Sequence, residues 1–199
     1  MTQNAQQVAG LLLAAGGGRR LGGRPKALLE HRGRPLVEYA VGVLRAAGCA
    51  RVHVVLGAEA AAVRERAELG DCVLVENPGW ADGMGSSLRA GLDSLTGTGA
   101  GAALVSLVDQ PGIGAEAVGR VLAACTSRES LVSAAYDGVR GHPVLFGAAH
   151  WAGIAATATG DRGARAYLKA HEEAITLVEC GDVAEPYDID TAADLEHLE

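Results

Sequence analysis

The sequence has few aromatic residues and only four cysteines. Aromatic residues make up 4% of the 199 residues and hydrophobic residues 49%, so the core must consist mostly of Ala, Val and Leu. The cysteines are widely spaced, without a Cys-x-x-Cys motif or paired histidines nearby: Cys49, Cys72, Cys125 and Cys180. This spacing argues against a zinc site and against a disulfide framework in a chain of this size. We expect the cysteines to pack as small hydrophobic side chains.

An excess of basic residues is missing, and so is a long hydrophobic run. The net charge of −7 argues against a nucleic-acid-binding protein, because such proteins usually carry a basic face. No stretch approaches the length needed to span a membrane. Residues 1–7 lack the basic start and the cleavage pattern of a signal peptide. These absences favour a reduced, cytoplasmic setting, and the length predicts a single domain over residues 1–199.

Glycine and locally concentrated positive charge stand out in residues 11–26. The preceding apolar run, residues 8–14, predicts a buried parallel strand, because its side chains are apolar on both faces. Three glycines then allow a tight turn whose backbone N–H groups point outward to an anion: Gly16, Gly17 and Gly18. Basic side chains surround the turn: Arg19, Arg20, Arg24 and Lys26. The combination predicts a loop that binds a polyphosphate.

Two well-known phosphate-binding motifs do not fit this loop. A Gly-x-Gly-x-x-Gly dinucleotide fingerprint that starts at Gly16 would need a third glycine where Leu21 stands. A P-loop has a glycine, four further residues, and then Gly-Lys followed by Ser or Thr. Counting in this way from Gly17 reaches Gly-Gly, and counting from Gly18 reaches Gly-Arg. The remaining alternative is a flexible glycine turn flanked by solvated arginines.

Apolar runs and helical periods alternate along the rest of the chain. We expect further strands at 52–56, 72–75, 102–108 and 175–178, and helices at 35–48, 59–69, 84–95, 148–156 and 163–170, with a last helix capped by Thr191. Asp137-Gly138, between two apolar runs, predicts a hairpin or a loop pair. This alternation predicts a single-domain α/β fold, a Rossmann-like three-layer sandwich. Its sheet should be mostly parallel, with an antiparallel edge strand or hairpin.

Polar residues follow several expected strands, where ligands of open α/β sheets bind. They are Asn77, Asp109-Gln110-Pro111, Asp188 and Asp190, together with the glycine loop. Asp109 directly follows an apolar strand, and a carboxylate there that faces a polyphosphate is where Mg²⁺ would be held. The alternatives are that Asp109 and Asp190 cap helices and that Asn77 begins an ordinary turn. His142 and His150 are more typical of surface or core histidines, and no nucleophile elbow supports a hydrolase.

Six segments, taken in order, carry a resemblance to a known family. They are residues 13–22 with Lys26, Asn77 with 83–88, 109–111, 141–146, 160–165 and 188–191. They read LAAGGGRRLG with K, N with GMGSSL, DQP, GHPVLF, GDRGAR and DIDT. Across residues 8–197 the chain thereby resembles the MobA-like nucleotidyltransferases and, among them, the molybdenum cofactor cytidylyltransferases.

The resemblance implies a role for each matched residue. The nucleotide would be bound by Leu13, Ala14, Ala15, Gly16, Gly17, Gly18, Lys26 and Asn77. The catalytic residues would be Arg20, Lys26 and Asp109, and the Mg²⁺ ligands Asp109 and Asp190. The acceptor would be bound by Ser86, Ser87, His142, Asp161 and Arg165.

The resemblance also implies a reaction. The terminal phosphate of molybdopterin, bearing molybdenum, would attack the α-phosphate of CTP and release pyrophosphate. Relatives that use GTP tend to carry glycine at the position of Ala15, so Ala15 favours CTP. The alternatives are a transferase that uses GTP or another acceptor, a nucleotide-dependent oxidoreductase of the nicotine blue oxidoreductase type, and a nucleotide-binding chaperone that hands the cofactor to a molybdoenzyme. The missing Gly-x-Gly-x-x-Gly motif speaks against the oxidoreductase.

Overall fold

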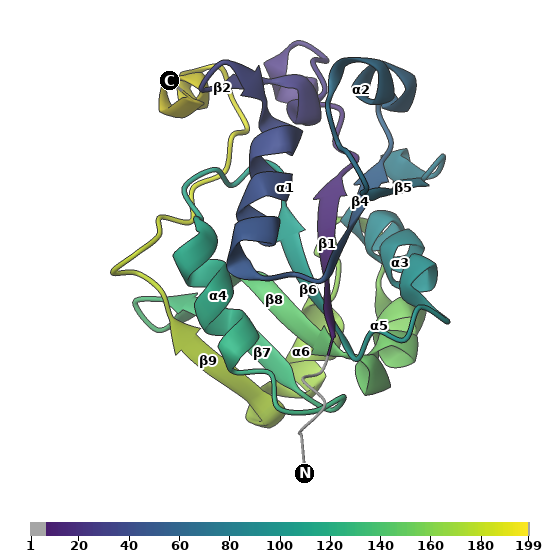
Figure 1. Cartoon of the computed structure of the whole chain (residues 1–199), viewed down its shortest axis with the longest axis vertical. Coiled ribbons are helices and arrows are strands. Elements are labelled where there is room, and N and C mark those ends of the chain that lie inside the picture. Colours follow the sequence, from purple (N-terminus) through teal and green to yellow (C-terminus); the bar gives the residue numbers. More distant parts are fainter. Residues whose placement is uncertain (1–6, 199) are drawn as a thin grey trace.

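A seven-stranded sheet runs through the centre of the computed structural model, which describes residues 7–198 (Figure 1). From edge to edge the strands are β5 (Val73–Glu76), β4 (Arg51–Leu56), β1 (Val8–Ala14), β6 (Ala102–Leu107), β8 (Val139–Gly147), β7 (Leu131–Tyr136) and β9 (Ile175–Glu179). All of them except β8 run in the same direction. The predicted α/β fold with a mostly parallel sheet is confirmed.

The antiparallel pairing comes from the β7–β8 hairpin. Asp137 and Gly138 form its turn with φ angles of 52° and 77°, the left-handed conformation that tight hairpin turns require. The sequence predicted either a hairpin or an antiparallel strand at the edge of the sheet, and the hairpin is confirmed. The antiparallel strand β8 is not at the edge, because it lies between β6 and β7. The edge position belongs to β9, which pairs with β7 in parallel.

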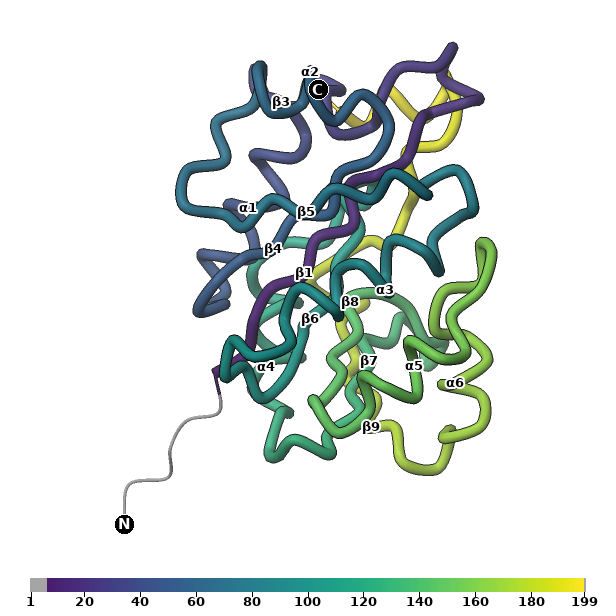
Figure 2. The backbone as a smooth tube through the Cα atoms, turned by 90° about the vertical axis from the view of Figure 1, so that its right-hand side faces the viewer, coloured from purple at the N-terminus to yellow at the C-terminus, as the bar shows by residue number. Residues whose placement is uncertain are grey.

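Helices cover both faces of the sheet. Helices α1 (Leu36–Ala47), α2 (Ala60–Arg66) and α4 (Ala115–Ala123) pack on one face, and α3 (Met84–Leu95), α5 (Trp151–Thr157) and α6 (Arg165–Ala170) on the other. Figure 2, turned by 90°, shows α1 and α4 on one side of the sheet and α5 and α6 on the opposite side. The three layers predicted from the sequence are thus present.

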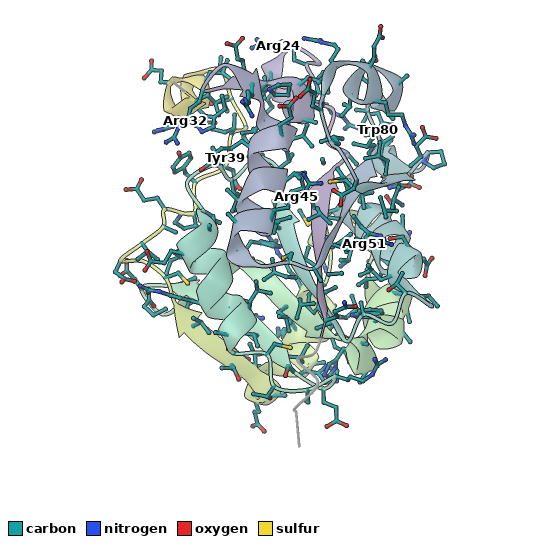
Figure 3. The ribbon with its side chains drawn as sticks, viewed as in Figure 1. Arg24, Arg32, Tyr39, Arg45, Arg51 and Trp80 are labelled. Carbon is teal, nitrogen blue, oxygen red and sulfur yellow. The ribbon has the colours of Figure 1, made fainter. Side chains whose placement is uncertain are left out.

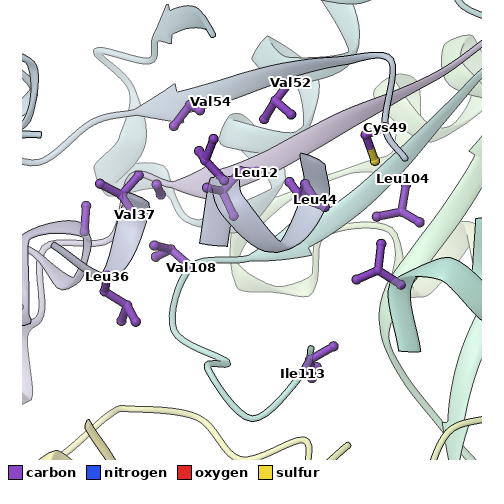
Figure 4. Packing of buried hydrophobic residues seen from close by; sticks show 14 of the residues in the cluster. Leu12, Leu36, Val37, Leu44, Cys49, Val52, Val54, Leu104, Val108 and Ile113 are labelled. Carbon is purple, nitrogen blue, oxygen red and sulfur yellow. The ribbon is translucent and has the colours of Figure 1, made fainter. Parts of the chain in front are cut away.

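The apolar stripe of α1 shows how the core is built. Leu36, Val37, Val41 and Leu44 are buried and pack on side chains of β1, β4 and β6 (Figure 4). Full burial of such a side chain contributes about 1.5–3 kcal/mol. Gly48 ends the helix with a φ of 105°, and its N–H donates to the carbonyls of the last turn. The helix predicted at 35–48 therefore agrees closely with α1.

Short 3₁₀ helices and a small hairpin connect these elements. The 3₁₀ helices are η1 (Arg19–Leu21), η2 (Lys26–Leu28), η3 (Trp80–Asp82), η4 (Ala148–His150), η5 (Gly160–Arg162), η6 (Glu172–Ala174) and η7 (Ala193–Leu198), and the hairpin strands are β2 (Glu30–His31) and β3 (Arg34–Pro35).

The end of the chain differs from the prediction. A helix follows Thr191 as predicted, but it is the 3₁₀ helix η7 and not an α-helix. The cap is also reversed. The carboxylate of Asp194 accepts hydrogen bonds from the backbone N–H groups of Asp190 and Thr191 and from the Thr191 hydroxyl. The side chain of Asp194, not that of Thr191, therefore fixes this turn.

The cysteines are free thiols, and Cys49 and Cys180 are buried among hydrophobic side chains, as expected. Within residues 7–198, no helix is both long enough and apolar enough to cross a membrane.

Candidate functional site

The glycine loop follows the carboxyl end of the central strand β1, at the top of the molecule in Figure 1. The N–H groups of Gly16, Gly17 and Gly18 have no hydrogen-bond acceptor within the described part of the chain. The loop closes because the N–H of Lys26 donates to the carbonyl of Gly16 over 3.4 Å. Consecutive unpaired N–H groups of this kind form a concave site for an anion. The loop therefore offers unpaired backbone donors beside Lys26.

Gly18 is required by the shape of this loop. Its φ of 58° lies in the left-handed region, and a β-carbon at this position would overlap the carbonyl oxygen of Arg24. The same residue accepts hydrogen bonds from Leu21 and Gly23, which coil the following residues into η1. The run of glycines therefore serves folding as well as access to an anion.

Lys26 connects two aspartates from distant parts of the chain. Its Nζ lies 2.5 Å from Oδ2 of Asp109 and 2.5 Å from Oδ1 of Asp190. Burial alone would lower the pKa of Lys26, but the charges and hydrogen bonds of both aspartates outweigh it and raise the pKa. Lys26 therefore carries a positive charge at neutral pH, directly beside the loop.

The backbone brings the two aspartates together. Asp109 lies just beyond the end of β6, and its carbonyl accepts a 2.9 Å hydrogen bond from the N–H of Ile189. Ile189 is fully buried and anchors the segment that carries Asp190. Asp194 holds the backbone N–H of Asp190 at 3.0 Å. The site is thus assembled by a terminal segment that lies against the end of a central strand.

A third carboxylate, Asp188, adds negative charge to this group. Gln110 donates a hydrogen bond of 2.9 Å from Nε2 to Oδ1 of Asp188. Partial desolvation, followed by repulsion from Asp109, raises the pKa of Asp188 above its usual range. The ammonium of Lys26 therefore balances only part of the negative charge that Asp109, Asp188 and Asp190 bring to this region.

The residues present fit a divalent cation. Mg²⁺ takes one or two protein carboxylates and completes its shell with phosphate oxygens and water. Asp109 and Asp190 supply two carboxylates that meet at Nζ of Lys26, and each keeps an oxygen that Lys26 does not bind. Among residues 7–198 there is no preformed cluster of three or more His, Cys, Asp or Glu ligands. Two carboxylates, each with an oxygen that Lys26 does not bind, match the number of protein ligands that Mg²⁺ takes.

The predicted arginine Arg20 lies at the rim of the site. Its guanidinium is 3.9 Å from Asp190, and its side chain is 73% exposed. Arg24 is also exposed and donates from Nε to the carbonyl of Leu21. Both cations can therefore reach an anionic ligand without breaking a buried contact.

Asn77, Ser86 and Ser87 form a buried network of their own. Asn77 donates from Nδ2 to the hydroxyl oxygens of Ser86 at 2.9 Å and Ser87 at 3.0 Å, and accepts from the N–H of Gly79. The Ser86 hydroxyl in turn lies within hydrogen-bond distance of the carbonyls of Gly79 and Gly83. The network fixes the loop between β5 and α3, and the side chains of Asn77, Ser86 and Ser87 point toward this loop.

The start of α3 packs against the segment that contains Asp161. A β-carbon on Gly83 would lie 2.6 Å from Oδ1 of Asp161, and one on Gly85 would lie 2.7 Å from the nitrogen of Thr159. Arg89 donates to the carbonyl of Ala158. The structure thus brings the segment of Ser86 and Ser87 next to Asp161, although the sequence separates them widely.

His142 lies on β8 within electrostatic range of Asp188 and Arg165. Burial lowers its pKa to about 4, the charge of Arg165 adds to this effect, and Asp188 opposes it. His142 is therefore neutral at neutral pH. His142 is thus within electrostatic range both of Arg165, a predicted acceptor residue, and of the carboxylate of Asp188.

Sequence reasoning missed two residues that shape the site. Asp194 fixes the turn that carries Asp190, and a carboxylate three residues after Thr191 was a usable signal for a cap. Trp80 lies against the glycine loop, but a single tryptophan in a turn gives no chemical signal in the sequence. Figure 3 shows Trp80 beside β4 and β5, at the same end of the molecule as Arg24.

Comparisons with known proteins show which proteins the chain resembles. A protein-family model described as MobA-like NTP transferase domain matches residues 10–175. The chain is 42% identical over 198 residues to a nicotine blue oxidoreductase from Paenarthrobacter nicotinovorans, covering 96% of each protein. It is 32% identical over 185 residues to a molybdenum cofactor guanylyltransferase from Rhodobacter capsulatus, covering 92% of this chain and 85% of that protein.

A solved structure shares the fold. A nucleotidyl transferase from Methanothermobacter thermautotroptrophicus superposes with a TM-score of 0.80 at 21% identity, over 96% of this chain and 95% of that chain. At this identity the similarity concerns the fold alone.

Proposed function

Because the chain belongs to the MobA-like NTP transferase family and is a nucleotidyltransferase, we propose that it transfers CMP from CTP to a phosphorylated pterin that bears molybdenum. The observation that carries the proposal is the convergence of Asp109 and Asp190 on Lys26, beside the unpaired N–H groups of the glycine loop. An anion cradle next to a carboxylate pair suits a nucleoside triphosphate with a divalent cation.

The reaction needs positioning and charge compensation rather than a covalent intermediate. A terminal phosphate oxygen of the pterin attacks the α-phosphorus of CTP, and the bond to the bridging oxygen breaks to release pyrophosphate. The loop N–H groups, Arg20 and Lys26 bind the triphosphate and hold the α-phosphorus in line. Mg²⁺, held by Asp109 and Asp190, would supply neutralisation of negative charge on the phosphate oxygens.

Two features of the chain support the choice of substrates. Ala15 is buried beside the loop, and the family resemblance implies that alanine at this position favours CTP over GTP. His142 lies on β8, next to β6, the strand that Asp109 follows, whereas the glycine loop follows β1 on the other side of β6. Arg165 lies within electrostatic range of the neutral His142. A positively charged side chain next to a neutral ring suits the phosphate and the pterin of the acceptor.

A nucleotide panel tests the proposal. The protein is incubated with Mg²⁺, molybdenum cofactor and one of CTP, GTP or ATP, and pyrophosphate release and product mass are measured. We expect pyrophosphate and a cytidylylated product with CTP, and none when the acceptor is omitted. A strong preference for GTP would overturn the choice of CTP, in line with the guanylyltransferase named among the relatives.

The 42% identity to a nicotine blue oxidoreductase supports a second candidate, a nucleotide-dependent oxidoreductase. The glycine loop lacks the Gly-x-Gly-x-x-Gly spacing of a dinucleotide fingerprint, which counts against it. The absorbance spectrum of the purified protein and NADPH oxidation with a quinone-like dye separate the two candidates. Flavin absorbance or dye-dependent NADPH oxidation without pyrophosphate release from any nucleotide would favour the oxidoreductase.

A further inference from the structure

Trp80 lies across two glycines at the edge of the nucleotide loop. A β-carbon on Gly17 would lie 3.0 Å from Cη2 and Cζ3 of the indole, and one on Gly57 would lie 2.6 Å from its Cγ. The β-carbon on Gly57 would also lie 2.8 Å from Cβ of Ala15. Glycine at both positions is therefore what allows the indole to lie beside Ala15, against the loop backbone.

The polar edge of this indole is free. Trp80 is half-buried, and its N–H has no acceptor among residues 7–198 and is not buried. The Cζ3–Cη2 corner faces Gly17, and Nε1 lies on the opposite edge of the ring. Trp151, the only other tryptophan, donates its N–H to the carbonyl of Phe146 at 2.9 Å. The N–H of Trp80 is therefore available to an acceptor outside the chain.

The loop that carries Trp80 is held in place. Asn77 accepts the N–H of Gly79 at 3.0 Å, and the backbone N–H of Trp80 donates to the carbonyl of Asn77 at 3.2 Å. The buried hydroxyls of Ser86 and Ser87 hold Asn77 from the other side. The backbone that carries the indole is therefore fixed by hydrogen bonds.

The strand order places Trp80 on the nucleoside side of the site. Asp109 follows β6, on one side of β1, so the phosphates and their cation belong on that side of the loop. Gly57 and Asn77 follow β4 and β5, on the other side of β1. A nucleotide whose phosphates face Asp109 therefore extends its base toward Trp80.

We propose that Trp80 forms a wall of the base pocket and, together with Ala15, narrows it to a one-ring base. This inference rests on the proposed function, because it assumes that the loop binds a nucleoside triphosphate. The indole supplies an aromatic surface and a free N–H donor for the base, and its bulk over Gly57 disfavours the second ring of a purine. The residue therefore both contacts the nucleotide and selects it.

Fluorescence tests the contact directly, because the chain has only two tryptophans. In Trp151→Phe, Trp80 is the sole tryptophan, and we expect its emission to change on titration with CTP. In Trp80→Phe, Trp151 is the sole reporter, and we expect no change. Calorimetry on the same proteins measures CTP binding independently. A Trp151→Phe protein that binds CTP without a change in Trp80 emission overturns the inference and leaves the proposed function standing.

Selectivity is tested with Trp80→Ala and Trp80→Phe in the pyrophosphate assay. We expect Trp80→Ala to lose about 10-fold in kcat/KM for CTP, the usual effect of removing an aromatic partner of a base, and to gain relative activity with GTP. Trp80→Phe should retain most of the preference for CTP. An unchanged ratio of CTP to GTP in Trp80→Ala overturns the inference. Failure of every variant and of the wild type to bind any nucleotide overturns the proposed function with it.

Discussion

The N–H of Ile189 donates a 2.9 Å hydrogen bond to the carbonyl oxygen of Asp109, and this bond aligns Asp190 with Asp109 at the end of β6. The two carboxylates then meet at Nζ of Lys26, 2.5 Å from each. A buried residue of the terminal segment thus completes a site that a central strand begins. Acidic side chains, a basic side chain and the glycine loop are therefore concentrated in one place on a chain with net charge −7.

The first prediction concerns Asp109. Asp109→Asn keeps the size of the side chain but removes one negative charge, so the fold should persist while the site loses affinity for a divalent cation. We expect Mg²⁺-dependent pyrophosphate release to fall by about 100-fold or more. Asp182→Asn is the matched control, because Asp182 pairs with Arg120 on the exposed surface. Normal turnover by Asp109→Asn would show that the metal assignment is wrong.

The second prediction concerns Asp194, which acts through Asp190. Asp194→Asn weakens the hydrogen bonds that fix the backbone of Asp190 and Thr191, so Asp190 is held less firmly. We expect the Mg²⁺ concentration for half-maximal activity to rise by about 10-fold, with a smaller change in kcat at saturating Mg²⁺. Thr191→Val removes only the hydroxyl bond and should change the Mg²⁺ requirement much less. An equal effect of both substitutions would contradict this role of Asp194.

The sequence predicted the elements that depend on local pattern. Val8–Ala14 is apolar on both faces and forms the central strand, and Asp137-Gly138 forms the hairpin turn. Asp109 could be placed because strand ends of a parallel sheet share one edge. These predictions needed no knowledge of which distant segments touch.

The remaining features depend on contacts between distant segments. The segment after Ile189 is fixed by its bond to Asp109 and by the hydrogen bonds of Asp194, and the predicted final helix takes the 3₁₀ form. The positions of β8 and β9 in the sheet depend on pairing partners that a single strand sequence does not specify. Trp80 acquires its place only because Gly57, in another loop, leaves room for it.

The third prediction separates folding from anion binding within the glycine loop. Gly18→Ala strains a residue with φ 58° and drives a β-carbon into the carbonyl of Arg24, so we expect a loss of about 2 kcal/mol in stability. Gly16→Ala meets no atom within 4 Å and should change stability by less than about 0.5 kcal/mol. Its methyl group would instead crowd the unpaired N–H groups and weaken CTP binding by about 10-fold. Chemical denaturation and calorimetry measure the two effects.

The Gly16→Ala and Gly18→Ala pair also provides its own control. If Gly16→Ala lost as much stability as Gly18→Ala, the loop would be strained throughout, and the strain would not be confined to Gly18. If Gly16→Ala bound CTP as well as the wild type, the N–H groups of the loop would not be the phosphate site.

The last prediction concerns the pH dependence of stability through His142. In the folded chain, burial lowers its pKa to about 4, whereas an unfolded histidine has a pKa of about 6.5. As the pH falls from about 6.5 to about 4, the unfolded chain therefore gains a proton that the folded chain does not bind. Stability should decrease over this range, by at most about 3 kcal/mol from His142 alone.

His142→Gln removes this titration, so its free energy of unfolding should depend less steeply on pH between about 4 and 6.5 than that of the wild type. Chemical denaturation at several pH values measures the two slopes, and the comparison cancels the contribution of carboxylates that titrate in both proteins. Above pH 7 the two curves should run parallel, because His142 is then neutral in both the folded and the unfolded chain. If the wild type and His142→Gln showed equal slopes below pH 6.5, the pKa of His142 would be the same in the folded and the unfolded chain. That result would contradict the lowering of its pKa by burial and by the charge of Arg165.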